Sequence, residues 1–228
     1  MPEFHPSSPH HTSWFASRKY SLLFLSLLAA LIIYPYAENH GFGYYAFRIM
    51  GSAAIVFCVY AASFRRSLVI VAIALSIPAF TQRILNLSAN ASALSILNIV
   101  LSFSFDAFIV VVIFRRVFGP QKPTSETIFG ALCIYLLLGF AFASIYGMLS
   151  LLDPHAFYLN PAVNTHSVPD RLDFVYYSYA TMTSLGGAGI APVSGEARSV
   201  TVMEALIGVL YLAVLISRLV GAYRHPSE

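Results

Sequence analysis

Charge is scarce in this sequence. Of its 228 residues only 10% are Asp, Glu, Lys or Arg, whereas 58% are hydrophobic. Soluble domains are about 25% charged and about 45–50% apolar, so this chain has too few polar groups to cover a soluble surface. The shortage excludes a soluble enzyme, a disordered segment and a nucleic-acid-binding protein, and it predicts an integral membrane protein.

Cysteines and catalytic motifs are also scarce. The two cysteines, Cys58 and Cys133, both lie inside apolar runs and lack the spacing of a disulfide framework or a metal site. No H-E-x-x-H sequence occurs, and all seven histidines lie outside the apolar runs. Because no nucleophile–base pair or ligand set falls at membrane depth, we expect no enzymatic activity and no metal site.

Long charge-free runs mark the expected membrane helices. Uncharged intervals of 18, 16, 16, 22 and 26 residues follow Lys19, Arg48, Arg66, Arg83 and Glu126. A helix needs roughly 20 apolar residues to cross a bilayer, and arginines that flank the shorter runs can reach the interface. With a last apolar run, these intervals predict six transmembrane helices, at residues 20–36, 44–64, 68–82, 92–114, 127–152 and 200–221.

The basic residues predict the orientation of these helices. With the amino terminus inside, nine of the 13 Lys and Arg residues fall in inner segments and four in or near outer ones. Because positive charge is enriched in cytoplasmic loops, we place both termini on the cytoplasmic side of the cell inner (plasma) membrane. An alternative makes residues 20–36 a cleaved signal peptide, since Arg18 and Lys19 precede that run.

The segment before the last helix is too short to cross. Residues 173–184 are apolar and rich in aromatic side chains, three glycines follow within 186–189, and Pro192 precedes the full-length span. Irregular backbone at membrane depth is tolerated only where it is buried in protein or lines water. The pattern is typical of a re-entrant pore loop, and the alternative is an ordinary outer loop with a buried aromatic patch. Prolines in residues 153–170 predict an irregular outer cap.

The stretch Thr181-Met-Thr-Ser-Leu-Gly186, with Pro192 and the helix that holds Glu204 and Gly208, resembles the pore region of bacterial potassium channels. The resemblance covers residues 125–221. It implies an all-α membrane fold in which a helix, a re-entrant loop and a second helix form the pore. In that family, backbone carbonyls from four such loops replace the hydration shell of K⁺. Because this chain has one loop, the resemblance implies a homotetramer in the lipid bilayer.

The resemblance also assigns a selectivity filter. Its residues are Thr183, Ser184, Leu185, Gly186, Gly187, Ala188 and Gly189. The family filter reads Thr-x-Gly-Tyr-Gly and then Asp, and counting back from Pro192 places Gly187 at the tyrosine, Ala188 at the second glycine and Gly189 at the acid. A register shifted by one residue aligns Gly187 and Gly189 with the two glycines. Because neither register restores the aromatic ring or the acid, the Gly-Gly-Ala-Gly sequence predicts weak K⁺ selectivity.

The four helices before the pore lack a voltage sensor. A voltage sensor needs several arginines along its fourth helix, but residues 92–114 hold one charged residue, Asp106, and Arg115 and Arg116 follow only at the inner end. Asp106 is either a functional buried acid or an acid that is hydrogen-bonded or faces inner water. The expected divisions are a cytoplasmic segment (1–19), a four-helix membrane domain (20–116), a pore domain (117–221) and a cytoplasmic tail (222–228).

Two residues of the last helix are expected to support the filter or gating. Glu204 lies about two turns into that helix from the outside, at the level where the filter should pack. Its carboxyl group can hydrogen-bond the filter backbone, and the alternative is a purely architectural role. Gly208, on the same face four residues later, is either a gating hinge or a close helix contact.

The sequence therefore predicts a potassium-channel-like tetrameric pore for monovalent cations, with no cofactor other than the permeant ion and no nucleic-acid partner. A non-conducting scaffold or sensor of the same fold is the first alternative. A secondary transporter is the second, although transporters usually have repeated halves with paired broken helices, and this sequence has one interrupted segment.

Overall fold

The computed structural model describes residues 18–33, 42–61, 66–85, 92–119, 124–164, 166–186 and 189–223. Within these ranges the chain forms seven helices and two short strands. The helices are α2 (Lys19–Ile33), α3 (Phe42–Ala61), α4 (Arg66–Leu85), α5 (Ser92–Val117), α6 (Ser125–Leu152), α7 (Arg171–Met182) and α8 (Gly195–Tyr223), and the strands are β1 (Phe157–Leu159) and β2 (Ile190–Pro192).

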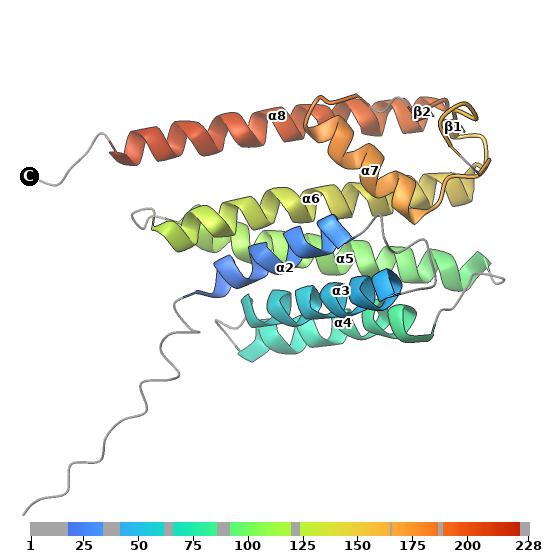
Figure 1. Cartoon of the computed structure of the whole chain (residues 1–228). Helices are drawn as coiled ribbons and strands as arrows, with labels where there is room; N and C mark the ends of the chain where they lie inside the picture. Colours follow the sequence, from blue (N-terminus) through green and yellow to red (C-terminus); the bar gives the residue numbers. More distant parts are fainter. Residues whose placement is uncertain are drawn as a thin grey trace, which may run out of the picture.

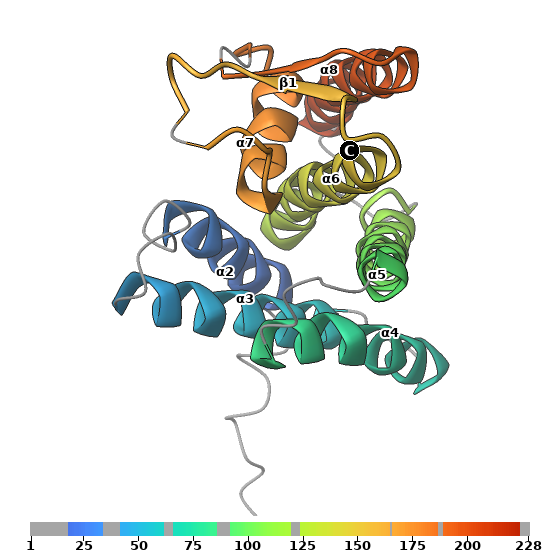
Figure 2. The ribbon, with the colours of Figure 1, turned by 90° about the vertical axis from the view of Figure 1, so that its right-hand side faces the viewer.

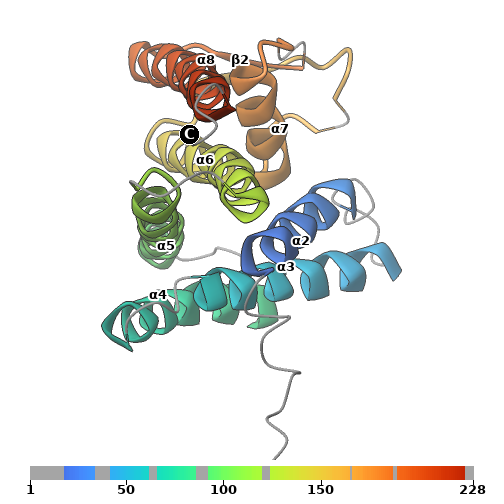
Figure 3. The same cartoon turned by 90° about the vertical axis from the view of Figure 1, so that its left-hand side faces the viewer.

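Helix α6 lies at the centre of the helix packing. The long helices α5, α6 and α8 are seen nearly end-on in Figures 2 and 3, whereas α3 and α4 are seen more from the side. Helix α6 packs against α2 and α5 from the first half of the chain and against α7 and α8 from the second half. The short α7 lies inclined against α6 and α8 (Figure 1). The strands lie at one end of α6 and α8, and the end of α8 that leads to the carboxyl terminus lies at the other (Figure 1).

Helix α6 begins at a reciprocal cap. The Thr124 hydroxyl accepts a hydrogen bond from the Thr127 amide (3.3 Å), and the Thr127 hydroxyl accepts one from the Thr124 amide (2.6 Å). Such a pair satisfies amides that the first turn of a helix leaves without partners. The Glu126 carboxylate also accepts hydrogen bonds from the Tyr20 amide (2.9 Å) and the Ser21 hydroxyl (2.5 Å). The starts of α2 and α6 are therefore tied together.

Two helices of the described residues are long and apolar enough to span a membrane. They are α6, with 28 residues, and α8, whose span candidate runs from Gly195 to Gly221. Half of the most apolar window of α6 is buried, but only 17% of that of α8. Helix α6 therefore forms the centre of the subunit, whereas α8 leaves most of its apolar side chains uncovered.

Each of the six predicted segments is helical over its described residues, and one small strand pair is the only sheet structure within the described ranges. The largest difference is at α8, which begins at Gly195 rather than at residue 200, because the Ser194 hydroxyl caps it by accepting the Ala197 amide (3.1 Å). Helix α5 continues to Val117, three residues beyond its predicted end. The predicted ends at 34–36 and 62–64 lie outside the described residues, as do residues 1–17 and 224–228.

Strand β1 lies in the outer cap and pairs with β2, which follows the predicted filter; the sequence did not predict this strand pair. Strand β1 pairs antiparallel with β2, with Phe157 opposite Pro192 and Leu159 opposite Ile190. Three-residue strands are too short to show an alternating pattern, and the prolines around β1 favour irregular structure. The pair joins the loop after α6 to the segment that leads into α8.

Candidate pore-loop site

Helix α7 begins at two aspartates. The Asp170 carboxylate accepts hydrogen bonds from the Leu172 amide (2.7 Å) and the Asp173 amide (2.9 Å), and the Asp173 carboxylate accepts the Asp170 amide (2.8 Å). This capping box fixes the start of the helix. Its 12 residues span about 18 Å at about 1.5 Å per residue, too little to cross a hydrocarbon core of about 30 Å. The segment is therefore the short apolar helix that the sequence predicts.

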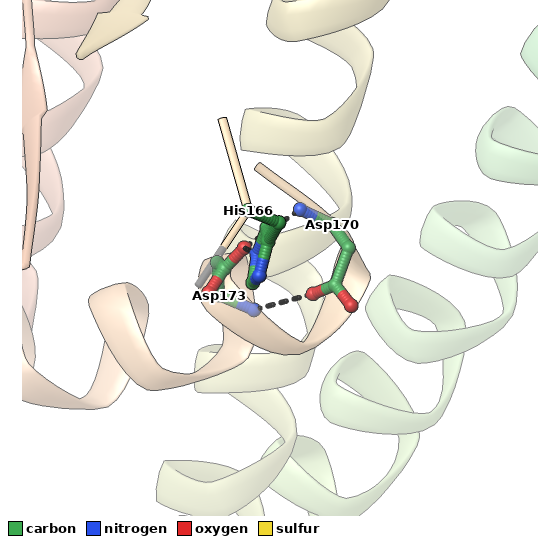
Figure 4. A group of neighbouring side chains, drawn as sticks. All are labelled: His166, Asp170 and Asp173. Carbon is green, nitrogen blue, oxygen red and sulfur yellow. Dashed lines mark hydrogen bonds and ion pairs between the residues drawn. The ribbon is translucent and has the colours of Figure 1, made fainter. Parts of the chain in front are cut away.

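A histidine joins this cap. Figure 4 shows His166 beside Asp170 and Asp173, and the His166 Nε2 lies 2.7 Å from the Asp173 Oδ2. Potential ligand atoms of the three residues lie within 4.8 Å of one another. Both carboxylates, however, already accept backbone amides of the first turn of α7. The hydrogen bonds give the group a structural role at the start of the helix.

The end of α7 is fixed against both long helices. The Tyr135 hydroxyl of α6 donates to the Met182 carbonyl (3.1 Å). On the other side, a Cβ atom built on Gly208 of α8 would lie 2.9 Å from the same carbonyl oxygen and 3.1 Å from the Met182 Cα. Because backbone cannot move away as a flexible side chain can, Gly208 allows α8 to approach the last residue of α7. Of the two roles considered for Gly208, the close helix contact is present.

A second close contact between α7 and α6 lies one turn earlier, at Tyr179. The Tyr179 hydroxyl donates to the Leu136 carbonyl of α6 (2.6 Å). A Cβ atom on Gly139 would lie 2.5 Å from the Tyr179 ring, so the ring occupies the space that this glycine leaves. Two tyrosines and two glycines therefore fix α7 between α6 and α8.

Glu204 joins α6, α7 and α8 through its carboxyl group. The side chain is fully buried; it accepts a hydrogen bond from the Tyr146 hydroxyl of α6 and is hydrogen-bonded to the Ser178 hydroxyl of α7. The Ser178 hydroxyl also lies 2.8 Å from the Gly139 carbonyl oxygen. A hydroxyl has one proton to donate, so both Ser178 contacts are full hydrogen bonds when the Glu204 carboxyl is protonated and donates to Ser178. The carboxyl group therefore bonds side chains of α6 and α7 rather than the predicted filter backbone.

The first predicted filter residues continue directly from α7. Ser184 and Gly186 have positive φ angles of 58° and 81°, and the Leu185 and Gly186 amides both point to the Ala180 carbonyl, at 2.9 and 3.3 Å. The Thr183 hydroxyl donates to the Tyr179 carbonyl (2.6 Å). These residues are exposed in the single subunit, Leu185 by 73%. The predicted filter residues Gly187 and Ala188 lie outside the described residues.

The last predicted filter residue is held by the outer cap. The Gly189 carbonyl accepts hydrogen bonds from the Asn160 amide (2.9 Å) and the Asn164 side-chain nitrogen Nδ2 (2.8 Å). The sequence analysis did not identify either asparagine. A sequence signal for such a contact is weak, because polar residues between prolines are typical of any irregular loop.

Asp106, the other acid singled out in the sequence, lies on a different helix from Glu204. It is half-buried on α5, which packs against α6 and α4, whereas Glu204 is enclosed between three helices. The packing of α7 involves Glu204 directly.

The comparison with known families covers this region. Residues 130–225 match a family model described as an ion channel. The matched range contains most of α6, the outer cap, α7 and α8. Over these residues the match confirms the resemblance to pore-loop cation channels that was found in the sequence. The ion-channel domain and the apolar helices α6 and α8 together indicate a membrane protein. No curated protein and no solved structure matches the chain.

Proposed function

We propose that the protein is a homotetrameric pore for monovalent cations in the plasma membrane. In each subunit the six helices α2 to α6 and α8 cross the bilayer, with both termini cytoplasmic, and α7 enters from the outside. Residues 183–189 then return to the outer surface as the filter. The observation that carries this proposal is the short α7, fixed between the two span candidates and followed by exposed residues in an ion-channel domain.

The exposed surface of α8 supports assembly with further copies. Its uncovered apolar side chains are Val202, Met203, Leu206, Ile207, Val209, Leu210, Leu212, Val214, Ile216 and Val220. These side chains surround most of the helix. A helix that contacts lipid on one side only needs a narrower apolar surface. In a tetramer, one part of this surface packs on a neighbouring subunit and another lines the inner cavity. The filter residues, exposed in one subunit, are then enclosed by four.

The charge of this region favours a cation. Residues 172–197 contain no Lys or Arg. The carboxyl end of a helix carries a partial negative charge, equivalent to about half an electron. Four α7 helices that end at one axis would direct four such charges toward an ion. Together with the backbone carbonyls of the loop, this arrangement attracts cations and repels anions.

We propose that K⁺ selectivity is weak. The Gly-Gly-Ala-Gly stretch of residues 186–189 has no ring to set the diameter of the filter and no acid at its mouth. A filter of adjustable width discriminates less between the hydration energies of K⁺ and Na⁺. Both registers of the filter lead to this expectation.

Thiol modification tests whether residues 183–189 line the ion path. Both native cysteines are buried, so a cysteine introduced at Leu185, which is 73% exposed, is the main target of a charged thiol reagent added from outside. We expect the reagent to block cation flux through Leu185→Cys in liposomes. The matched control is Val168→Cys, which is 70% exposed in the outer cap. Its modification should leave the flux unchanged.

Two results would contradict the proposal. The first is equal modification of both variants without block of Leu185→Cys. The second is a stable monomer or dimer in a native mass measurement, because one or two loops cannot surround an ion. A tetramer that is silent to every cation would favour the non-conducting scaffold or sensor instead.

A further inference from the structure

We infer that Asn164 of the outer cap is a positioning residue for the filter, which it holds through the Gly189 carbonyl. The inference rests on the proposed channel function. It concerns the feature in which this loop departs most from its family, since no tyrosine or acid in residues 186–189 is present to anchor the outer end of the filter.

The Asn164 side chain contacts two carbonyl groups. Its nitrogen Nδ2 lies 2.8 Å from the Gly189 carbonyl oxygen and 2.8 Å from the Asn160 carbonyl oxygen. Because both neighbours are acceptors, only the NH₂ end of the amide can face them, and its two protons serve one carbonyl each. The Asn160 amide donates a second hydrogen bond to Gly189, at 2.9 Å. The Asn164 side chain and the Asn160 backbone therefore form one clamp on the outer end of the loop.

The clamp continues into the strand pair. Directly after Gly189, Ile190 of β2 pairs with Leu159 of β1. Beyond β2, the Val193 and Ser194 amides both point to the Ala156 carbonyl, at 2.8 and 3.3 Å. The chain from Gly189 to the start of α8 is thus hydrogen-bonded to the outer cap along its whole length. This backbone ladder requires no particular side chain in the filter.

The contact at Gly189 is also close. A Cβ atom at this position would lie 3.3 Å from the Asn164 Nδ2 and 3.4 Å from its Oδ1. The amide group therefore lies directly against the glycine backbone and limits its movement toward the outer cap. A side chain at this position requires the Asn164 amide to shift by a few tenths of an ångström.

The hydrogen bonds divide the predicted filter in two. A carbonyl oxygen has two lone pairs, and both of those on Gly189 have donors. This carbonyl is consequently unavailable to an ion, and the ion-binding carbonyls belong to residues before it. Gly189 is the anchor of the filter, and Asn164 sets the position of that anchor.

Isosteric substitutions at the two asparagines test the inference. Asn164→Asp keeps the shape but replaces both donors with an oxygen that faces two carbonyl oxygens. Asn160→Asp is the matched control, because it adds the same charge to the same loop. The new carboxylate still offers an oxygen at the Oδ1 position as acceptor for the Ala162 amide (3.0 Å). The backbone amide of residue 160, which donates to the Gly189 carbonyl, is unchanged. Asn164→Ala removes the donors without adding charge.

Two measurements on the full-length protein separate holding from filter function. Hydrogen exchange of the amides in residues 157–160 and 189–194 should rise about tenfold in Asn164→Asp and Asn164→Ala, as expected when one or two hydrogen bonds are lost. The ratio of K⁺ to Na⁺ flux in liposomes should move toward one in both variants. Asn160→Asp should match the parent in both measurements.

Three outcomes would contradict the inference. Unchanged exchange in both Asn164 variants would show that the clamp does not hold Gly189. Faster exchange with an unchanged flux ratio would reduce Asn164 to a structural role in the cap. Equal effects of Asn164→Asp and Asn160→Asp would assign the change to charge at the outer mouth. If the parent passes no ion, the proposed channel function fails. The hydrogen-exchange measurement still tests the clamp, because it requires no ion flux.

Discussion

Replacement of Glu204 by glutamine and by alanine should have very different effects on stability. The carboxyl group is fully buried and contacts the hydroxyl groups of Tyr146 and Ser178. A glutamine side chain has the same shape and supplies one acceptor for Tyr146 and a donor for Ser178. The Ser178 hydroxyl can then donate to the Gly139 carbonyl, which lies 2.8 Å away. The amide thus reproduces the hydrogen bonds of a protonated carboxyl group.

The structure gives the magnitude of each change. Glu204→Gln exchanges hydrogen bonds of similar kind and should alter the free energy of unfolding by less than about 1 kcal/mol per subunit. Glu204→Ala leaves the fully buried Tyr146 hydroxyl without its acceptor, which costs about 1–3 kcal/mol. The cavity that remains among three helices adds to this cost, so we expect a loss of about 3 kcal/mol or more. For a chain of this size that loss lowers the melting temperature by about 6–12 °C.

Thermal unfolding of the purified protein in detergent measures the difference. Asp106→Ala is the comparison, since Asp106 is also a membrane-helix acid but is only half-buried on α5. We expect stability to decrease in the order parent, Glu204→Gln, Asp106→Ala, Glu204→Ala. If glutamine destabilises as much as alanine, the buried group functions as a charged carboxylate and the proton count is wrong. Negligible effects of both Glu204→Ala and Asp106→Ala would mean that the level of the filter is misplaced.

Two further predictions concern the loop and its contact with α8. Gly208→Ala should destabilise the assembly by about 1–3 kcal/mol per subunit, because the new methyl group would lie 2.9 Å from the Met182 carbonyl oxygen; thermal unfolding measures this, and an unchanged melting temperature would contradict the close contact. The triple variant with Gly187→Tyr, Ala188→Gly and Gly189→Asp should keep the tetramer and gain K⁺ selectivity over the parent, measured as flux from paired K⁺ and Na⁺ gradients. A variant that assembles without gaining selectivity would show that the alignment of the loop is wrong.

The long helices could be predicted because their signal lies in consecutive residues. Five charge-free runs and one further apolar run located the six segments. The limits of α8 were less accurate, because its first turn, from Gly195, is polar and its cap is a single serine. Whether a run is helical is thus decided locally, whereas its first residue depends on one hydrogen bond.

The contacts that define the site could not be predicted in this way. Glu204 was singled out by its depth in the last helix, but its partners Tyr146 and Ser178 are 58 and 26 residues distant in the chain. Asn164 and Gly189 are likewise 25 residues apart and meet through strands of three residues. Such contacts depend on how helices and loops pack laterally, and one sequence carries no periodic signal for that packing.

Ion flux through the purified protein in liposomes tests whether this protein conducts cations. K⁺ and Na⁺ gradients are applied separately to the same preparation, with empty liposomes as the reference. We expect flux of both cations, with K⁺ modestly faster than Na⁺. Absence of flux under both gradients from an intact tetramer would contradict conduction, and strict exclusion of Na⁺ would contradict the weak selectivity inferred from residues 186–189.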